Sequence, residues 1–98
     1  MLHLTLRQLK VFESVARHLS YSRAADELHL TQPAVSMQIK QLEDNINLPL
    51  FEQLGKRIFL TEAGQELYQY SRAISQQLAD LEVALDELKG MERGKLNI

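Results

Sequence analysis

Apolar residues recur three and four positions apart over much of this chain, which is the spacing of one face of an α-helix. The first such stretch runs from Leu6 to Leu19, and Thr5 with Gln8 three residues later matches a capping box, a typical helix start. The apolar stripe consists of Leu6, Leu9, Phe12, Val15, Ala16 and Leu19. The pattern therefore predicts an amphipathic helix over residues 6–19.

Two further helices are predicted before residue 50. The first covers residues 23–28 and has Ser22 as its N-cap. The second runs from Gln32 to Ile46, with Thr31 as its N-cap and Pro33 in its first turn, where the missing N–H of proline costs nothing. The apolar face of this helix consists of Val35, Ile39, Leu42 and Ile46.

The pattern changes between residues 50 and 60, where two short extended apolar runs flank the turn 54–56 around Gly55. This arrangement predicts a small β-hairpin. A long helix is then predicted from Thr61 to about Lys89, with Gly90 ending it. About 28 residues span about 42 Å, which is longer than a domain of 60 residues is wide, so the helix must project.

Apolar residues along this long helix have the mean spacing of 3.5 that is typical of a coiled-coil seam. The seam consists of Leu67, Tyr70, Ile74, Leu78, Leu81, Leu85 and Leu88. Such a stripe needs a covering surface, which is either a second chain or the helix's own domain. The length of the helix favours a second chain.

Composition narrows the class of protein. The chain has 98 residues, enough for one small domain, with 45% hydrophobic residues and a net charge of −2. Residues 1–60 hold seven Lys or Arg against six Asp or Glu, so DNA binding has to be argued from pattern rather than from bulk charge. Without cysteine there is no disulfide scaffold, and no apolar run reaches the roughly 20 residues that span a bilayer. We expect a cytoplasmic protein with no membrane contact.

No constellation of residues indicates catalysis. The three histidines, His3, His18 and His29, lack the spacing of metal ligands. Neighbouring carboxylates such as Glu43 and Asp44 point about 100° apart on a helix, so they are predicted to be solvated surface groups rather than an acid/base pair. We therefore expect no metal, no cofactor and no enzyme activity.

Three helices, a tight turn between the second and third, and a following hairpin make up a winged helix-turn-helix, a mainly α fold. On the third helix, Pro33, Met37 and Lys40 lie opposite the apolar face, with Ser36 and Gln41 at the margins. Amide, hydroxyl and apolar side chains of this kind can read base edges in a major groove. The plainer alternative is that the face is simply solvated.

Five runs of residues carry a resemblance to a known family. They are Ser22–Ala25, Leu28–Ser36, Leu42-Glu43, Leu50–Glu52 and Leu60–Gly64. In this order and spacing the chain resembles the N-terminal region of LysR-type transcriptional regulators over residues 5–90. Within that family, residues 31–43 and 51–56 are most similar to the regulators of carbon-dioxide-fixation (RuBisCO) operons.

The resemblance implies a role for each matching position. The residues implied to contact bases are Gln32, Pro33, Ser36 and Met37. Those implied to contact the DNA backbone are Ser22, Arg23, Thr31, Lys40 and Gln41. The hairpin tip, with Lys56 and Arg57, is implied to reach the minor groove. Many family members have arginine where this chain has Met37, which puts in doubt any base contact inferred from them.

The resemblance also implies the domain organisation. Residues 1–60 would form the DNA-binding domain, residues 61–90 a linker helix that pairs antiparallel with that of a second subunit, and residues 91–98 the start of a truncated effector-binding domain, with 95–98 opening a strand. We expect a homodimer on a double-stranded, inverted-repeat operator with half-sites roughly 34–36 Å apart. A small-metabolite effector would act only through the missing C-terminal domain.

A different function stays open on the residues alone. The chain could be a helical interaction module whose seam binds another protein, without DNA binding. The two functions differ in salt dependence, which is steep for a DNA binder and weak for an apolar docking module.

Overall fold

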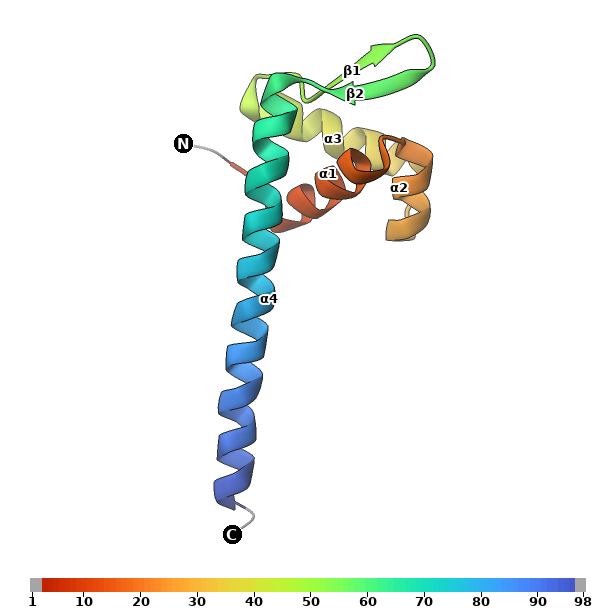
Figure 1. Ribbon diagram of the computed structural model, residues 1–98. Coiled ribbons are helices and arrows are strands. Elements are labelled where there is room, and N and C mark those ends of the chain that lie inside the picture. Colours follow the sequence, from red (N-terminus) through yellow and green to blue (C-terminus); the bar gives the residue numbers. More distant parts are fainter. Residues whose placement is uncertain (1–2, 97–98) are drawn as a thin grey trace.

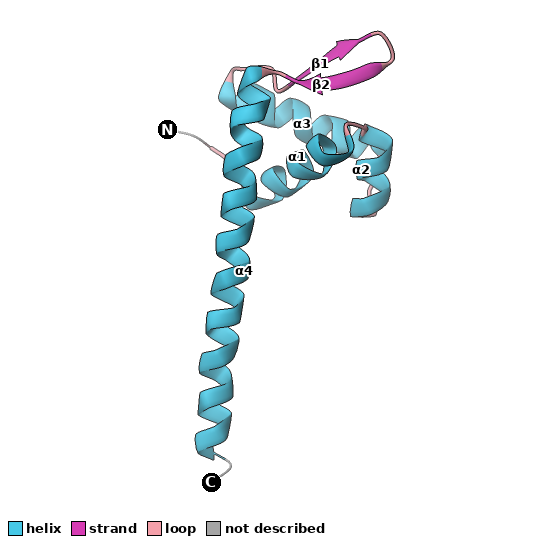
Figure 2. Cartoon of the chain, viewed as in Figure 1, coloured by secondary structure: helices cyan, strands magenta, loops and turns pink. Residues whose placement is uncertain are grey.

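The computed structural model of the chain describes residues 3–96, with side chains described for residues 3–91. The elements are α1 (Leu6–His18), α2 (Tyr21–Leu28), α3 (Gln32–Ile46), β1 (Phe51–Leu54), β2 (Arg57–Leu60) and α4 (Glu62–Leu96). Helices α1–α3 pack beside one end of α4, and the hairpin extends outward from that same end (Figures 1 and 2). This arrangement confirms the predicted winged helix-turn-helix with a projecting helix.

The core lies where α1, α2 and α3 meet. Its buried side chains are Val11, Phe12, Val15, Ala16, Ala24, Ala25, Val35, Ile39, Leu42 and Leu50. The predicted inner face of α3 is confirmed, with Ile46 half-buried at its end. The predicted stripe of α1 is wrong at both ends, because Leu6 is 50% and Leu19 41% exposed. Leu19 lies past the last turn in a left-handed conformation, which turns it away from the helix face.

Two of the three N-caps predicted before residue 50 are confirmed. Thr5 and Gln8 form the expected capping box: the Gln8 N–H donates to Thr5 Oγ1 at 3.0 Å and the Thr5 N–H donates to Gln8 Oε1 at 3.2 Å. Thr31 Oγ1 accepts a hydrogen bond from the Ala34 N–H at 3.2 Å. These caps satisfy backbone donors that have no partner within the helix.

The predicted start of α2 is wrong by two residues. Ser20, not Ser22, is the N-cap, and its hydroxyl accepts from the Arg23 N–H at 3.2 Å. Helix α2 therefore begins at Tyr21, and Ser22 and Arg23 lie in its first turn.

The hairpin matches the prediction. Strands β1 and β2 are antiparallel, from the pair Phe51 and Leu60 at the base to the pair Leu54 and Arg57 at the tip. Gly55 turns the chain with a φ of +65°, a conformation that glycine adopts at low cost. At the base, the Phe51 ring packs 5.5 Å from that of Phe12, which joins the hairpin to the core.

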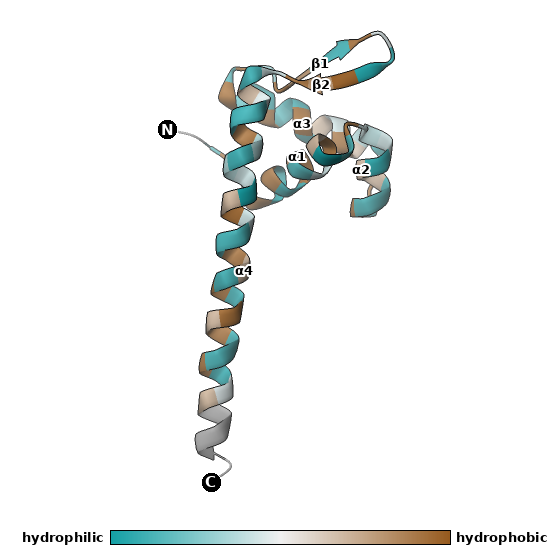
Figure 3. Cartoon of the chain, viewed as in Figure 1, coloured by the Kyte–Doolittle hydropathy of each residue, from teal (hydrophilic) through white to brown (hydrophobic). Residues whose placement is uncertain are grey.

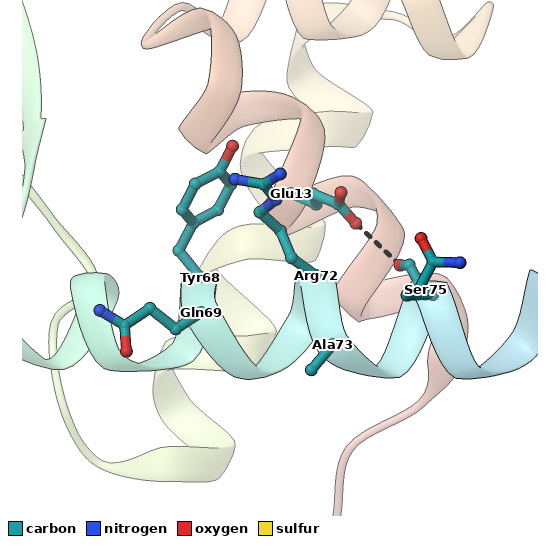
Figure 4. A pocket seen from close by; sticks show the side chains of 7 residues that line it. Glu13, Tyr68, Gln69, Arg72, Ala73 and Ser75 are labelled. Atoms are coloured by element: carbon teal, nitrogen blue, oxygen red, sulfur yellow. Dashed lines mark hydrogen bonds between the residues drawn. The ribbon is translucent and has the colours of Figure 1, made fainter.

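Helix α4 lies against the domain through small residues. A Cβ on Gly64 would lie 2.2 Å from the Leu50 carbonyl oxygen, and Ser71 is completely buried. Farther along, the Ser75 hydroxyl donates to Glu13 Oε2 at 2.9 Å (Figure 4). The start of α4 is thus held close to the domain, with a polar contact to α1 near the point where the helix leaves it.

Beyond this contact α4 projects, as predicted. The described side chains of residues 79–91 are all exposed, and the molecule measures 64 × 30 × 18 Å. The predicted end at Gly90 is wrong, because α4 continues to Leu96. An interior glycine costs a helix only about 1 kcal/mol, which the turns on either side offset. Lys95 and Leu96 are accordingly helical rather than the start of a strand, while residues 97 and 98 lie outside the described part of the chain.

Candidate nucleic-acid interface

The outer face of α3 is open to solvent. Every residue predicted to contact DNA from this helix or its cap is exposed: Thr31, Gln32, Pro33, Ser36, Met37, Lys40 and Gln41. Met37 in particular keeps 62% of its surface accessible, although it is a large apolar residue. The opposite face is buried in the core, so α3 presents its N-terminal half outward on a rigid support.

A polar hollow of about 510 Å³ adjoins the N-terminal end of α3. It is lined by residues 18–23 at the α1–α2 junction, by Gln32, and by Gln53, Lys56, Arg57 and Ile58 of the hairpin. The fold thus brings the first turn of α2, the first turn of α3 and the hairpin tip together. Three of the lining residues are cationic, and none of the described residues that line the hollow is acidic.

The electrostatics of this hollow suit an anion. Arg23, Lys56 and Arg57 supply positive charge from two separate elements. The N-terminus of α2 adds the positive end of a helix dipole and unpaired backbone N–H groups. A phosphate group is the anion that such a combination of donors binds well.

Sequence reasoning missed Gln53 as a residue of this hollow. Gln53 lies on β1, opposite Ile58, and its amide donates to the Gly55 carbonyl at 3.3 Å. Side chains two apart on a strand share a face, so Gln53 lies on the same side as the inward-facing Phe51. That alternation was the available signal.

A second polar cluster fixes α2 against α1. The Arg17 guanidinium lies 2.6 Å from both carboxylate oxygens of Glu27, and the Ser14 hydroxyl also donates to Glu27. These hydrogen bonds, that of Arg17 first, lower the pKa of Glu27 to about 2. The pKa of Arg17 is raised by the same pair. Arg17 is exposed, but its guanidinium is engaged in an ion pair within the protein that supports the position of α2.

The two carboxylates near the end of α3 differ, contrary to the prediction that both are solvated. Asp44 is exposed, but Glu43 is half-buried and its Oε2 accepts from the Leu50 N–H at 2.7 Å and from the Phe51 N–H at 3.5 Å. Both lie in the C-terminal half of α3, away from its open N-terminal half. Their charges are thus kept clear of the surface formed by Gln32 and its neighbours.

The seam of α4 lies largely on the outside of the molecule. Leu67 and Leu78 are half-buried, and the exposed members are Tyr70, Ile74, Leu81, Leu85 and Leu88, with exposed fractions from 38% to 65%. Figure 3 shows hydrophobic segments recurring along α4 below the three packed helices. The C-terminal half of the seam does not pack on its own domain.

Neither a membrane helix nor a metal cluster is found in the described part of the chain. None of its helices is long and apolar enough to cross a membrane. Within residues 3–96 no three His, Cys, Asp or Glu side chains gather in a way that could hold a metal ion.

Comparison with known families gives one match that covers most of the domain. Residues 6–65 match the family described as bacterial regulatory helix-turn-helix protein, lysR family. The resemblance stated from the sequence is therefore confirmed at the level of the family.

Two curated relatives of high identity are both described as transcriptional regulators. A RuBisCO operon transcriptional regulator of Allochromatium vinosum is 64% identical over 97 residues, which is 99% of this chain and 32% of that protein. The HTH-type transcriptional regulator CbbR of Rhodospirillum rubrum is 54% identical over 95% of this chain and 31% of its own. The chain thus spans about a third of the length of these relatives.

Similar folds occur in crystal structures that contain DNA. The BenM DBD in complex with catB site 1 DNA superimposes with a TM-score of 0.83 and 28% identity, covering 87% of this chain and 96% of that one. Vibrio fischeri DarR in complex with DNA gives a TM-score of 0.81 at 27% identity, over 91% of this chain and 30% of that one.

Proposed function

The chain belongs to the lysR family of bacterial regulatory helix-turn-helix proteins, and from this premise we propose that it binds double-stranded DNA with α3 in the major groove. The observation that carries the proposal is the position of the cation-lined hollow beside the open N-terminal end of α3. With α3 in the groove, that hollow meets the adjacent phosphates. The DNA complexes of proteins with this fold support the proposal.

Base recognition is proposed for the N-terminal half of α3. The residues in contact with base edges are Gln32, Pro33, Ser36 and Met37. Glutamine can form a pair of hydrogen bonds with adenine, a serine hydroxyl can donate or accept, and the apolar Met37 side chain suits a thymine methyl group.

Backbone contacts are proposed on both sides of α3. They come from Ser22, Arg23, Thr31, Lys40 and Gln41, while Lys56 and Arg57 of the hairpin tip enter the adjacent minor groove. Narrow A·T-rich minor grooves have an enhanced negative potential that attracts such cations. These contacts position the protein on the duplex, and the base contacts specify the sequence.

The regulated genes are proposed from the relatives. Because similar proteins are named as RuBisCO operon transcriptional regulators, we propose that this protein controls carbon-dioxide-fixation genes. That a metabolite effector acts through a further domain stays a prediction.

A homodimer is proposed through the seam of α4. Three pairs of seam positions, Leu67 with Leu88, Tyr70 with Leu85 and Ile74 with Leu81, are symmetric about the point between residues 77 and 78. Two antiparallel copies would therefore place six of the seven seam residues opposite apolar residues, with Leu78 opposite Gln77 at the centre, as a two-fold interface allows. An inverted-repeat operator matches this symmetry.

The test begins by selecting duplexes from a random pool with the wild-type chain. Competition binding then compares the selected duplex with a random one. We expect Gln32→Ala to lose about 1–3 kcal/mol of discrimination, because a pair of base hydrogen bonds is lost. Arg23→Ala should weaken both duplexes about equally and reduce the salt dependence by one phosphate contact.

Two results would contradict the proposal. A pool without enriched sequences would exclude specific recognition. Binding to the chain that barely responds to salt would favour the alternative of an apolar interaction module.

A further inference from the structure

The hairpin depends on its base for its orientation. Every described side chain from Glu52 to Arg57 is exposed, and only Phe51, Ile58 and Leu60 pack toward the core. A two-stranded sheet is marginally stable by itself. The angle between the hairpin and α3 must therefore be set by contacts where the strands begin and end.

Glu43 provides such a contact from α3. Its Oε2 accepts from the Leu50 N–H at 2.7 Å and from the Phe51 N–H at 3.5 Å. Leu50 precedes β1, so its N–H has no partner across the hairpin. A carboxylate that accepts from a backbone N–H forms a hydrogen bond about twice as strong as a neutral one.

The same segment is also held by Thr61, the residue between β2 and α4. The Thr61 N–H donates to the Leu50 carbonyl at 3.0 Å, and the Thr61 hydroxyl donates to the Pro49 carbonyl at 2.6 Å. Leu50 is thus fixed from α3 on its N–H side and from Thr61 on its carbonyl side. Of these contacts, only the one from Glu43 connects the hairpin directly with the helix proposed to lie in the major groove.

Small rotations at this base move the tip considerably. Each strand of the hairpin spans about 10 Å at about 3.3 Å per residue, and the two-residue turn brings the tip to about 13 Å from the base. A rotation of about 15° at its base would displace the tip by about 3 Å, a full hydrogen-bond length. Lys56 and Arg57 would then miss the groove next to the one that α3 occupies.

We propose that Glu43 is a positioning residue that holds the hairpin at the angle at which Lys56 and Arg57 reach DNA while α3 lies in the major groove. The inference rests on the proposed DNA binding. It adds a role for a carboxylate that does not itself touch the duplex, and it explains why a negative charge is kept at the end of a DNA-reading helix.

The experiment measures the slope of log affinity against log salt for the selected duplex. Each phosphate contact contributes a slope of about −0.9. Glu43→Ala should make the slope shallower by about 1 to 2, as if the hairpin cations were lost. Asp44→Ala is the matched control, because it removes the same charge one residue away, from an exposed side chain for which no hydrogen bond to Leu50 or Phe51 is found in the described part of the chain.

Two conservative variants separate the effect of side-chain length at position 43 from the effect of its charge. Glu43→Gln keeps an oxygen at the right distance and should retain the wild-type slope. Glu43→Asp keeps the charge but is one methylene shorter, so the slope should become shallower. In a background lacking both cations (Lys56→Ala with Arg57→Ala), Glu43→Ala should cause no further change in slope.

Folding is followed separately by amide hydrogen exchange. In Glu43→Asp, the amides of Leu50 and Phe51 should exchange faster while those of α3 stay protected. The inference is overturned if Glu43→Ala and Glu43→Asp keep the wild-type slope, or if the loss is equally large without the hairpin cations. A wild-type chain without any salt slope would instead overturn the proposed DNA binding.

Discussion

At the scale of single residues, the carboxylate of Glu27 is held in its ionised form by hydrogen bonds that lower its pKa to about 2. Its carboxylate accepts from Arg17 through both oxygens and from the Ser14 hydroxyl, and so connects the C-terminal half of α1 with the end of α2. Helix α2 contributes Ser22 and Arg23 to the proposed phosphate contacts. The ion pair therefore supports the binding surface without facing DNA.

The pKa of Glu27 gives a prediction for acid stability. Folding lowers this pKa from 4.5 to about 2, so the folded state is stabilised by the ionised form. This contribution is fully present above pH 4.5 and is lost as the pH falls through about 2. We expect the difference in Tm between wild type and Glu27→Gln to be largest at neutral pH and to shrink between pH 4.5 and 2.

The control for this measurement is the neighbouring residue Asp26, which is exposed and whose side chain makes no hydrogen bond within the described part of the chain. Asp26→Asn should change Tm little at any pH. A Tm difference for Glu27→Gln that persists unchanged at pH 2 would show that its hydrogen bonds, and not its ionisation, matter for stability.

At the scale of elements, the attachment of α4 depends on a residue without a side chain. A Cβ at position 64 would meet the Leu50 carbonyl oxygen at 2.2 Å, far inside contact distance. The same carbonyl accepts from the Thr61 N–H, so the backbone cannot withdraw without losing that hydrogen bond. Gly64 therefore sets how closely α4 approaches the base of the hairpin.

We predict that Gly64→Ala destabilises the chain by about 1–3 kcal/mol, as an overpacked contact does, although alanine is the better helix former. Urea denaturation followed by circular dichroism measures this. Gly90→Ala is the control, since a Cβ there meets nothing within 4 Å. It should leave stability unchanged or raise it by up to about 1 kcal/mol. Equal effects of the two substitutions would contradict the close-approach argument.

The elements that the sequence predicted well are those with local signals. The limits of α3 follow from Thr31, Pro33 and a regular apolar face, and the hairpin turn follows from Gly55. The start of α2 was misplaced because Ser20 and Ser22 are both good caps and because α1 ends on a left-handed leucine rather than on a glycine.

In the candidate site, too, the sequence predicts what depends on one element and misses what depends on contacts between elements. The outward face of α3 follows from 100° steps along one helix, so Gln32 and Met37 could be placed without the fold. The contact of Glu43 with the residue before β1 depends on how the chain returns after α3, and the position of Gln53 in the hollow depends on the tilt of the hairpin over α2. Strand alternation does place Gln53 on the same face as Phe51, but the sequence shows neither which element that face meets nor that Glu43 reaches Leu50.

At the scale of the whole molecule, the exposed seam of α4 explains why such a long helix is built onto a small domain. Leu81 and Leu85 are 52% and 47% exposed, far from the core. Isolated apolar residues are common on surfaces, but a continuous stripe on a projecting helix marks an interaction surface. In the proposed antiparallel pair, the seam also fixes the distance between the two α3 helices.

We predict that Leu81→Asp converts the proposed dimer to monomers, measured by light scattering or analytical ultracentrifugation. Symmetry places two unpaired carboxylates in one interface, each opposite the partner's Ile74, at a cost of about 3 kcal/mol or more, roughly a hundredfold in the dissociation constant. Val83→Asp is the control, because Val83 is 58% exposed but lies on the other side of α4.

The monomeric Leu81→Asp variant should keep its helix content and its affinity for one half-site. It should lose the additional affinity that two linked DNA-binding domains gain on an inverted repeat. If Val83→Asp dissociates the dimer and Leu81→Asp does not, the partner lies against another face of α4.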